Sequence, residues 1–139
     1  METERFITID PDNRRREEDE EDRECRPQTH VHEFTASTQL AEEGDDRHNH
    51  RFAGVSGQVI PVPGSHKHWI VSRTDFLDHF HLVRALSGPA IPLPDPDAPP
   101  SQWKHVHFVE GFTTVVDGHR HEFEFGTLIE APLVDEDVD

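Results

Sequence analysis

The stretch His30-Val-His-Glu-Phe-Thr-Ala-Ser-Thr38 decides the fold of this chain, because it is the first copy of a unit that occurs six times. Each copy has two histidines separated by one residue, an apolar residue two positions later, and a Ser or Thr eight positions after the first histidine. All 12 histidines belong to these units, so the unit is the organising repeat of the domain. The pairs are His30/His32, His48/His50, His66/His68, His79/His81, His105/His107 and His119/His121.

The spacing within the unit predicts strands rather than helices. The two histidines and the apolar residue stand at i, i+2 and i+4, which places them on one face of a strand but scatters them around a helix. Val, Ile, Phe, Trp and Thr accompany them, and Asp, Gly and Pro bound the segments. The apolar positions are Phe34, Phe52, Ile70, Val83, Val109 and Phe123, and the hydroxyl positions are Thr38, Ser56, Thr74, Ser87, Thr113 and Thr127.

Neighbouring units combine into three longer repeats, which begin at His30, His66 and His105. The first two of them end alike, in Ser56-Gly-Gln-Val-Ile-Pro-Val-Pro63 and Ser87-Gly-Pro-Ala-Ile-Pro-Leu-Pro94. We therefore predict an all-β domain of six His-x-His strands in three hairpin-like repeats. The strands would form a small antiparallel sheet, a sandwich or a barrel.

Turns and prolines divide these repeats. Val116-Asp-Gly-His119 has the composition of a tight hairpin turn. Proline cannot donate to a strand ladder, so Pro61, Pro63, Pro92 and Pro94 are expected in the connections rather than inside strands.

Length and composition limit the other possibilities. The 139 residues suffice for one domain, and 29 acidic against 13 basic residues argue against nucleic acid or an anionic membrane surface as the main partner. Only 32% of the residues are hydrophobic, so the core is expected to be thin. Cys25 is the one cysteine, which excludes an internal disulfide and leaves metal ions or a partner chain to supplement the core.

The chain divides into a repeat domain and two charged ends. Residues 1–29 are expected to form a disordered charged arm, residues 30–133 the domain, and residues 134–139 an acidic tail. A short strand at 6–9 that pairs with a sheet edge is the alternative for the start of the arm. Neither a secretory leader nor an apolar run long enough to cross a membrane is evident. These features predict a cytoplasmic protein, with incorporation into a spore or a cell-surface assembly as the alternative.

Paired histidines on strands predict metal binding, because two such pairs on adjacent strands place four imidazoles in one patch. All 12 histidines are candidate ligands. The simplest grouping is one four-histidine site in each repeat, and the alternative is three repeats that converge on a pseudo-threefold axis and share six-histidine layers. The simplest sites would be His30, His32, His48 and His50; His66, His68, His79 and His81; and His105, His107, His119 and His121.

Zinc is the metal expected first at such a tetrahedral set, with copper or nickel as alternatives if four nitrogens are coplanar. A metal-free ladder of hydrogen-bonded histidines and a proton-operated switch are the other hypotheses. We find no catalytic constellation, so we expect a binding protein that stores, buffers or is stapled by metal rather than an enzyme. A metalloenzyme is the last alternative.

Some strands also have an apolar second face. This face predicts association with further copies of the chain, and a self-assembling structural protein, such as a filament or spore-layer subunit, is the main alternative function. A sandwich core within one chain would cover the face equally well. The residues are Trp69, Val71, Phe80, Leu82, Val106 and Phe108.

The histidine blocks carry a resemblance to a known family. His30 to Thr38, Asp46-Arg-His-Asn-His-Arg-Phe-Ala-Gly-Val-Ser-Gly57 and Asp117-Gly-His-Arg-His-Glu-Phe123 resemble the YmaF-like family of small histidine-rich bacterial proteins over about residues 30–130. The resemblance implies a bacterial source, a Gram-positive spore former or a relative, and brings no established activity. The long charged amino-terminal arm departs from the compact family pattern.

Overall fold

Three antiparallel hairpins carry the repeats. The computed structural model describes residues 28–133. The predicted arm up to residue 27, which includes Cys25 and the candidate strand at 6–9, and the acidic tail lie outside these residues. The prediction of an all-β domain of three hairpins is confirmed. The hairpins are β2 (Val31–Ser37) with β3 (Arg51–Val55), β6 (Trp69–Arg73) with β7 (Leu82–Leu86), and β9 (Lys104–Phe112) with β10 (Glu122–Gly126).

Short elements extend the hairpins. Between residues 28 and 133 the strands form four small sheets, in the orders β10-β9-β8, β11-β2-β3, β4-β5 and β6-β7. A tight turn joins β9 to β10, where Asp117 and Gly118 have φ of 54° and 79°, as the Asp-Gly signal predicts. The short elements are β4 (Ile60–Val62), β5 (Ser65–Lys67), β8 (Ala90–Leu93), β11 (Glu130–Ala131) and the 3-10 turns η1 (Gly44–Asp46) and η2 (Pro100–Gln102).

Two prolines lie within strands, contrary to expectation. Pro61 is the middle residue of β4, and Pro92 lies in β8. Among the strands of residues 28–133, each of the two has a partner on one side only, β5 for β4 and β9 for β8. An edge strand tolerates proline because the missing N–H can fall on the side without a partner.

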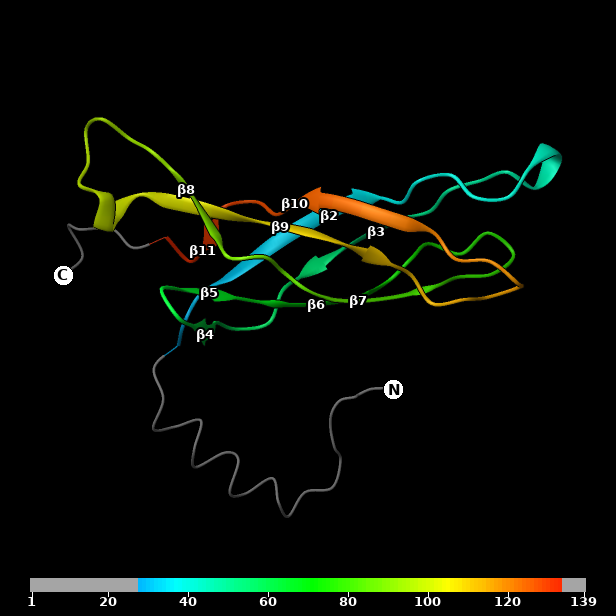
Figure 1. The fold of residues 1–139 in the computed structure, drawn as a ribbon, viewed down its shortest axis with the longest axis horizontal. Helices are drawn as coiled ribbons and strands as arrows, with labels where there is room; N and C mark the ends of the chain where they lie inside the picture. Colours follow the sequence, from blue (N-terminus) through cyan, green and yellow to red (C-terminus); the bar gives the residue numbers. More distant parts are fainter. Residues whose placement is uncertain (1–27, 134–139) are drawn as a thin grey trace, which may run out of the picture.

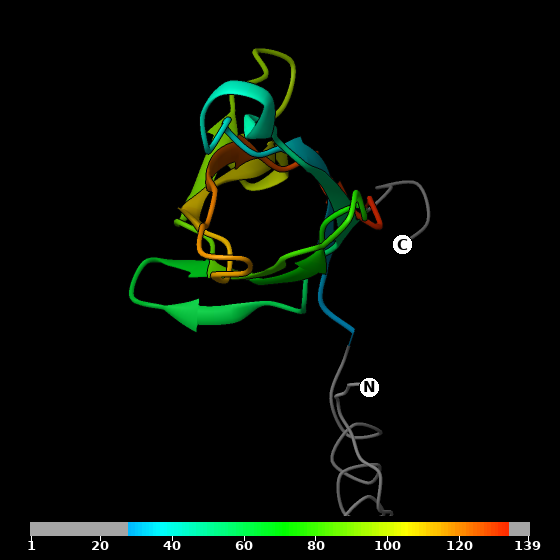
Figure 2. The same cartoon turned by 90° about the vertical axis from the view of Figure 1, so that its right-hand side faces the viewer.

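The three hairpins surround a common axis that runs along the molecule (Figures 1 and 2). Backbone hydrogen bonds join each hairpin to the next: Gly57 N–H donates to Trp69 O, Gly88 N–H to Phe108 O, and Leu128 N–H to Glu33 O. Equivalent bonds at the other end of the hairpins complete the cycle. The structure is therefore threefold in pattern, as the three longer repeats require.

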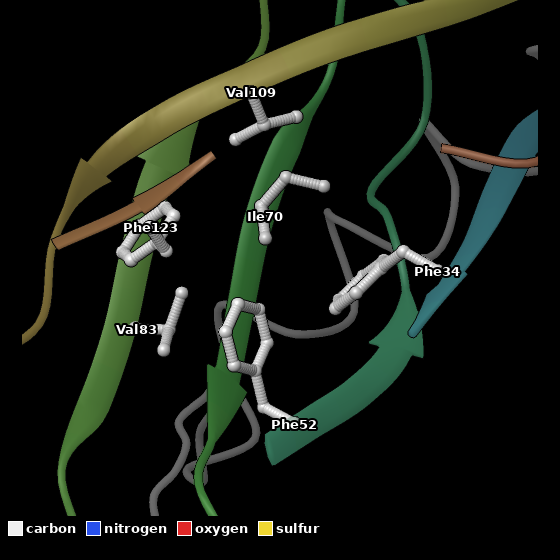
Figure 3. Close-up of a cluster of buried hydrophobic side chains, with 6 residues drawn as sticks. All are labelled: Phe34, Phe52, Ile70, Val83, Val109 and Phe123. Carbon is white, nitrogen blue, oxygen red and sulfur yellow. The ribbon is translucent and has the colours of Figure 1, made fainter. Parts of the chain in front are cut away.

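The buried apolar core consists of the six apolar positions of the repeat, which meet on the axis (Figure 3). Small residues oppose large ones across each hairpin; for example, Gly54 pairs with Phe34, and a β-carbon at Gly54 would approach the Phe34 ring to 2.9 Å. The predicted core is confirmed, and it is thin. Its members are Phe34, Phe52, Ile70, Val83, Val109 and Phe123.

The hydroxyl residues of the repeat fix the register of the hairpins. Each buried hydroxyl accepts a hydrogen bond from the backbone N–H of the second histidine on the partner strand, such as His32 N–H to Ser56 Oγ at 3.0 Å. A buried N–H without such a partner would cost about 1–3 kcal/mol. The other five bonds are His50 to Thr38, His68 to Ser87, His81 to Thr74, His107 to Thr127 and His121 to Thr113.

The outer face of the strands keeps much of its apolar surface exposed, including Val71 at 63% and Leu82 at 50%. Arginines cover part of it: Arg84 lies 4.3 Å from the Trp69 ring centre and Arg73 lies 5.0 Å from that of Phe80. No helix among residues 28–133 has the length and apolarity needed to cross a membrane.

Candidate metal centres

The histidines gather in two clusters, one at each end of the axis. Site A brings together the first, third and fifth pairs, and site B the second, fourth and sixth. The prediction of one four-histidine site per repeat is wrong, and the threefold alternative describes the arrangement. Site A consists of His30, His32, His66, His68, His105 and His107, and site B of His48, His50, His79, His81 and His121. We count His119 in site B as well, because its Nε2 lies 3.2 Å from that of His48.

Antiparallel pairing explains this sorting. In the first hairpin Glu33 pairs with Val55 and Ser37 with Arg51, so His32 and His50 lie at opposite ends. The apolar positions fall between them, and each cluster receives one histidine pair from each hairpin. The second, fourth and sixth pairs precede their strands rather than lie within them, so the prediction of histidines on strands is approximate there.

The second histidine of every pair is fully buried and held in one tautomer. Its Nδ1 lies 2.8–3.2 Å from a backbone carbonyl of a neighbouring hairpin, for example 2.9 Å from Leu128 O in the case of His32. A carbonyl only accepts, so Nδ1 carries the proton and Nε2 is left as a lone pair. The remaining acceptors are Asp75 O for His50, Gly57 O for His68, Thr114 O for His81, Gly88 O for His107 and Gln39 O for His121.

The first histidines of site B are oriented in the same way by acidic segments. His48 Nδ1 donates to Asp46 O at 2.7 Å, and His79 Nδ1 contacts the Asp78 carboxylate. His119 Nδ1 lies 3.3 Å from both Asp117 O and the Glu42 carboxylate. All six rings of site B therefore present an unprotonated Nε2 to the centre of the cluster.

The Nε2 atoms of each cluster converge. In site A the three first histidines, His30, His66 and His105, have Nε2 atoms 3.0–3.1 Å apart. In site B, His48 Nε2 lies 3.2 Å from the Nε2 atoms of both His119 and His121. His68 in site A and His81 in site B, each the second histidine of its pair, have a buried Nε2 with no hydrogen-bond partner. Buried ring nitrogens of this kind are suited to a metal ion.

Burial lowers the pKa of histidines in both clusters. It lowers the pKa of His30 to about 4 and that of His107 in site A to about 3, with the neighbouring histidines adding to the effect. Burial likewise lowers the pKa of His121 in site B to about 4. Neutral imidazole is the form that binds metal, so the histidines with a lowered pKa are in the coordinating form at neutral pH.

Site B opens into an acidic pocket. The three first histidines line a pocket of about 360 Å³ together with Leu77 and five carboxylates. The loops that form it lie together at the η1 end of the molecule (Figure 1). The carboxylates are those of Glu42, Asp45, Asp46, Asp78 and Asp117.

The sequence prediction missed these carboxylates, although a signal was present. An aspartate stands one or two positions before each first histidine of site B: Asp46, Asp78 and Asp117. The first histidines of site A lack one, and two of them adjoin Lys67 and Lys104.

Among residues 28–133, the carboxylate of Glu130 on β11 contacts site A. Its Oε1 accepts a hydrogen bond from His105 N–H at 3.0 Å and lies 3.4 Å from His105 Nδ1. Glu130 therefore orients this histidine as the aspartates orient those of site B.

A family described as "Spore germination protein GerY/YamF" (YmaF) matches residues 27–129. Neither the curated proteins nor the solved structures contain a match.

Proposed function

The chain belongs to the YmaF family, and from the geometry of its two histidine clusters we propose that it binds two divalent transition-metal ions, one in site A and one in site B. One observation carries the proposal: the six rings of site B all donate their Nδ1 protons outward. Six lone pairs then face one another with no proton between them. A cation at the centre converts this repulsion into coordination.

The ions would also staple the fold. Each cluster takes two histidines from each hairpin, so an ion in either site ties all three hairpins together. The apolar core alone is small, and small cores are commonly supplemented by metal. Because the unfolded chain does not preassemble the site, the free energy of metal binding contributes to folding.

We propose that site B also exchanges its ion with the surroundings, which gives the protein a storage or buffering role. The acidic pocket supports this role, because carboxylates around an opening concentrate cations at it. The family description supports the spore as the setting in which that metal is held or released.

Elemental analysis of protein purified without a metal-affinity column tests the proposal. We expect two ions per chain for the wild type, one for His68→Asn in site A, one for His81→Asn in site B, and none for the double variant. The two sites thus serve as controls for each other. If the variants do not fold, chelated wild-type protein can be titrated with metal instead. A wild type that binds no metal in either experiment overturns the proposal.

Self-association is the second candidate function, and the exposed apolar outer face favours it. Trp69, Val71, Phe80, Leu82 and Phe108 are all more than a third exposed, and Val106 is partly exposed beside β8. A second copy of the chain is the partner we propose, and light scattering gives the test. A monomer at every concentration would exclude this candidate and leave the metal proposal intact.

A further inference from the structure

The rings of each cluster are arranged around three axes. In site A each histidine ring lies edge-on to four of the other five rings, with centroids 4.5–5.2 Å apart. The fifth ring stands on the opposite side of the cluster. The opposite pairs are His30 and His107, His32 and His66, and His68 and His105. Six points, each adjacent to all others except the one opposite, form an octahedron.

Site B repeats this arrangement with different residues. Its edge-on rings have centroids 4.8–5.1 Å apart. The opposite pairs are His48 and His81, His50 and His119, and His79 and His121. Each opposite pair joins a first histidine of one hairpin to a second histidine of another, so the octahedron depends on all three hairpins.

The nitrogen distances agree with this shape. Adjacent ligands of an octahedron are separated by √2 times the metal–ligand distance. The Nε2 separations of 3.0–3.3 Å therefore correspond to metal–nitrogen distances of about 2.1 to 2.3 Å, at or just beyond the 2.0–2.1 Å typical of zinc–histidine bonds. Opposite nitrogens would then lie about 4.2 to 4.7 Å apart. In site A all six ligand atoms lie within 4.8 Å of one another. In site B five of the six do, and the remaining histidine, His119, has its Nε2 3.2 Å from that of His48.

We propose that each ion is held by six imidazole nitrogens in octahedral geometry, and that the sites select Ni²⁺, Co²⁺ or Fe²⁺ over zinc. This inference rests on the proposed function, namely that ions bind at all. Zinc has a filled d shell and usually takes four ligands, and copper(II) favours a tetragonal set. Ions with a partly filled d shell gain ligand-field stabilisation from six nitrogens. The expectation of zinc rested on four-histidine sites, which the structure does not contain.

Closed coordination also bears on function. Six protein ligands leave no position for a substrate or an activated water, which catalytic metal sites keep open. The proposal therefore assigns both ions to binding and structure rather than to catalysis.

Spectroscopy of the metal-loaded full chain tests the geometry. Protein freed of metal and loaded with cobalt should show the weak visible absorption of six-coordinate cobalt, not the much stronger bands of a tetrahedral site. X-ray absorption of the nickel-loaded protein should give six nitrogens at about 2.1 to 2.3 Å. When nickel and zinc are offered at equal concentration, nickel should be the ion retained.

The outcomes separate the two proposals. Four short metal–nitrogen distances, intense cobalt bands and retention of zinc would overturn the octahedral inference while leaving metal binding in place. Failure to take up nickel, cobalt, iron or zinc would overturn both.

Discussion

Sites A and B have the same interior and different entrances. In both, buried second histidines donate Nδ1–H to a neighbouring hairpin and direct Nε2 to the axis. At the entrance, the part of the chain that the structure describes brings the Glu130 carboxylate to site A, whereas five carboxylates line the pocket of site B. In the proposed function, the repeat would therefore determine how an ion is coordinated, and the loops outside the repeat would determine how it enters and leaves.

Metal removal gives the largest expected effect. A ligand at a thousand times its dissociation constant stabilises a fold by about 4 kcal/mol. Loss of that stabilisation lowers the Tm of a domain of this size by about 15 °C or more. We expect a strong chelator to produce at least this fall, and to empty site B before site A. Melting curves and timed elemental analysis measure the two effects. An unchanged Tm would show that neither ion staples the fold.

Acidification tests a property that the two sites share, the lowered pKa of their buried histidines. The pKa values of His30, His107 and His121 lie at about 4, 3 and 4 in the folded protein, against about 6.5 for an unfolded histidine. At pH values between the folded and the unfolded pKa, the unfolded chain binds more protons than the folded one. The stability of the metal-free protein should therefore fall as pH decreases from about 6.5 to about 4.

Urea unfolding of chelated protein at low temperature, at several pH values, measures this loss. Bound metal competes with protons, so the metal-loaded protein should resist acid to a lower pH. Equal urea midpoints at pH 7 and pH 5 would contradict neutral, buried histidines.

The residues that orient the histidines give a smaller and site-specific effect. Glu130→Gln removes the carboxylate beside His105 and should weaken site A, while Asp78→Asn should weaken site B through His79. Loss of such a partner typically costs about 10-fold to 100-fold in metal affinity. Isothermal titration of each variant should show one weakened site and one unchanged site. Two equally weakened sites would mean that the clusters are coupled rather than independent.

Much of the interior follows from sequence because it depends on local periodicity. The spacing i, i+2, i+4 placed His32 and Phe34 on one buried face, and both are buried. The grouping of the histidines failed because it assumed that pairs on adjacent strands are neighbours. In the antiparallel hairpins of this chain, the second histidine of one strand instead lies opposite the hydroxyl residue of the partner strand, as His32 lies opposite Ser56.

The entrances could not be predicted from periodicity. Glu42 and Asp117 come from loops 75 residues apart in sequence, and they share a pocket only because the hairpins converge at one end. The aspartates that precede His48, His79 and His119 were visible as a pattern. Their meaning required the threefold arrangement, which no local signal contains.

Neutralising the entrance of site B gives the smallest expected effect, one on rates alone. Asp45 and Asp46 are exposed residues of the pocket and face solvent. Charges around an opening raise association rates by about 10-fold to 1,000-fold, so Asp45→Asn with Asp46→Asn should slow metal entry into site B by about 10-fold at low salt. Stopped-flow uptake of cobalt measures the rate.

The matched control is Glu122→Gln with Glu124→Gln, which removes the same charge from exposed positions on β10, outside the residues that line the pocket. We expect the control to load at the wild-type rate, and the pocket variant to converge on that rate at high salt, because salt screens exposed charges. Site A should take up metal at the same rate in the wild type, the pocket variant and the control variant. Equal slowing in both variants would show that the net charge of the protein, rather than the position of the carboxylates, controls the rate of metal entry. The different entrances of sites A and B would then not affect the rate of metal uptake.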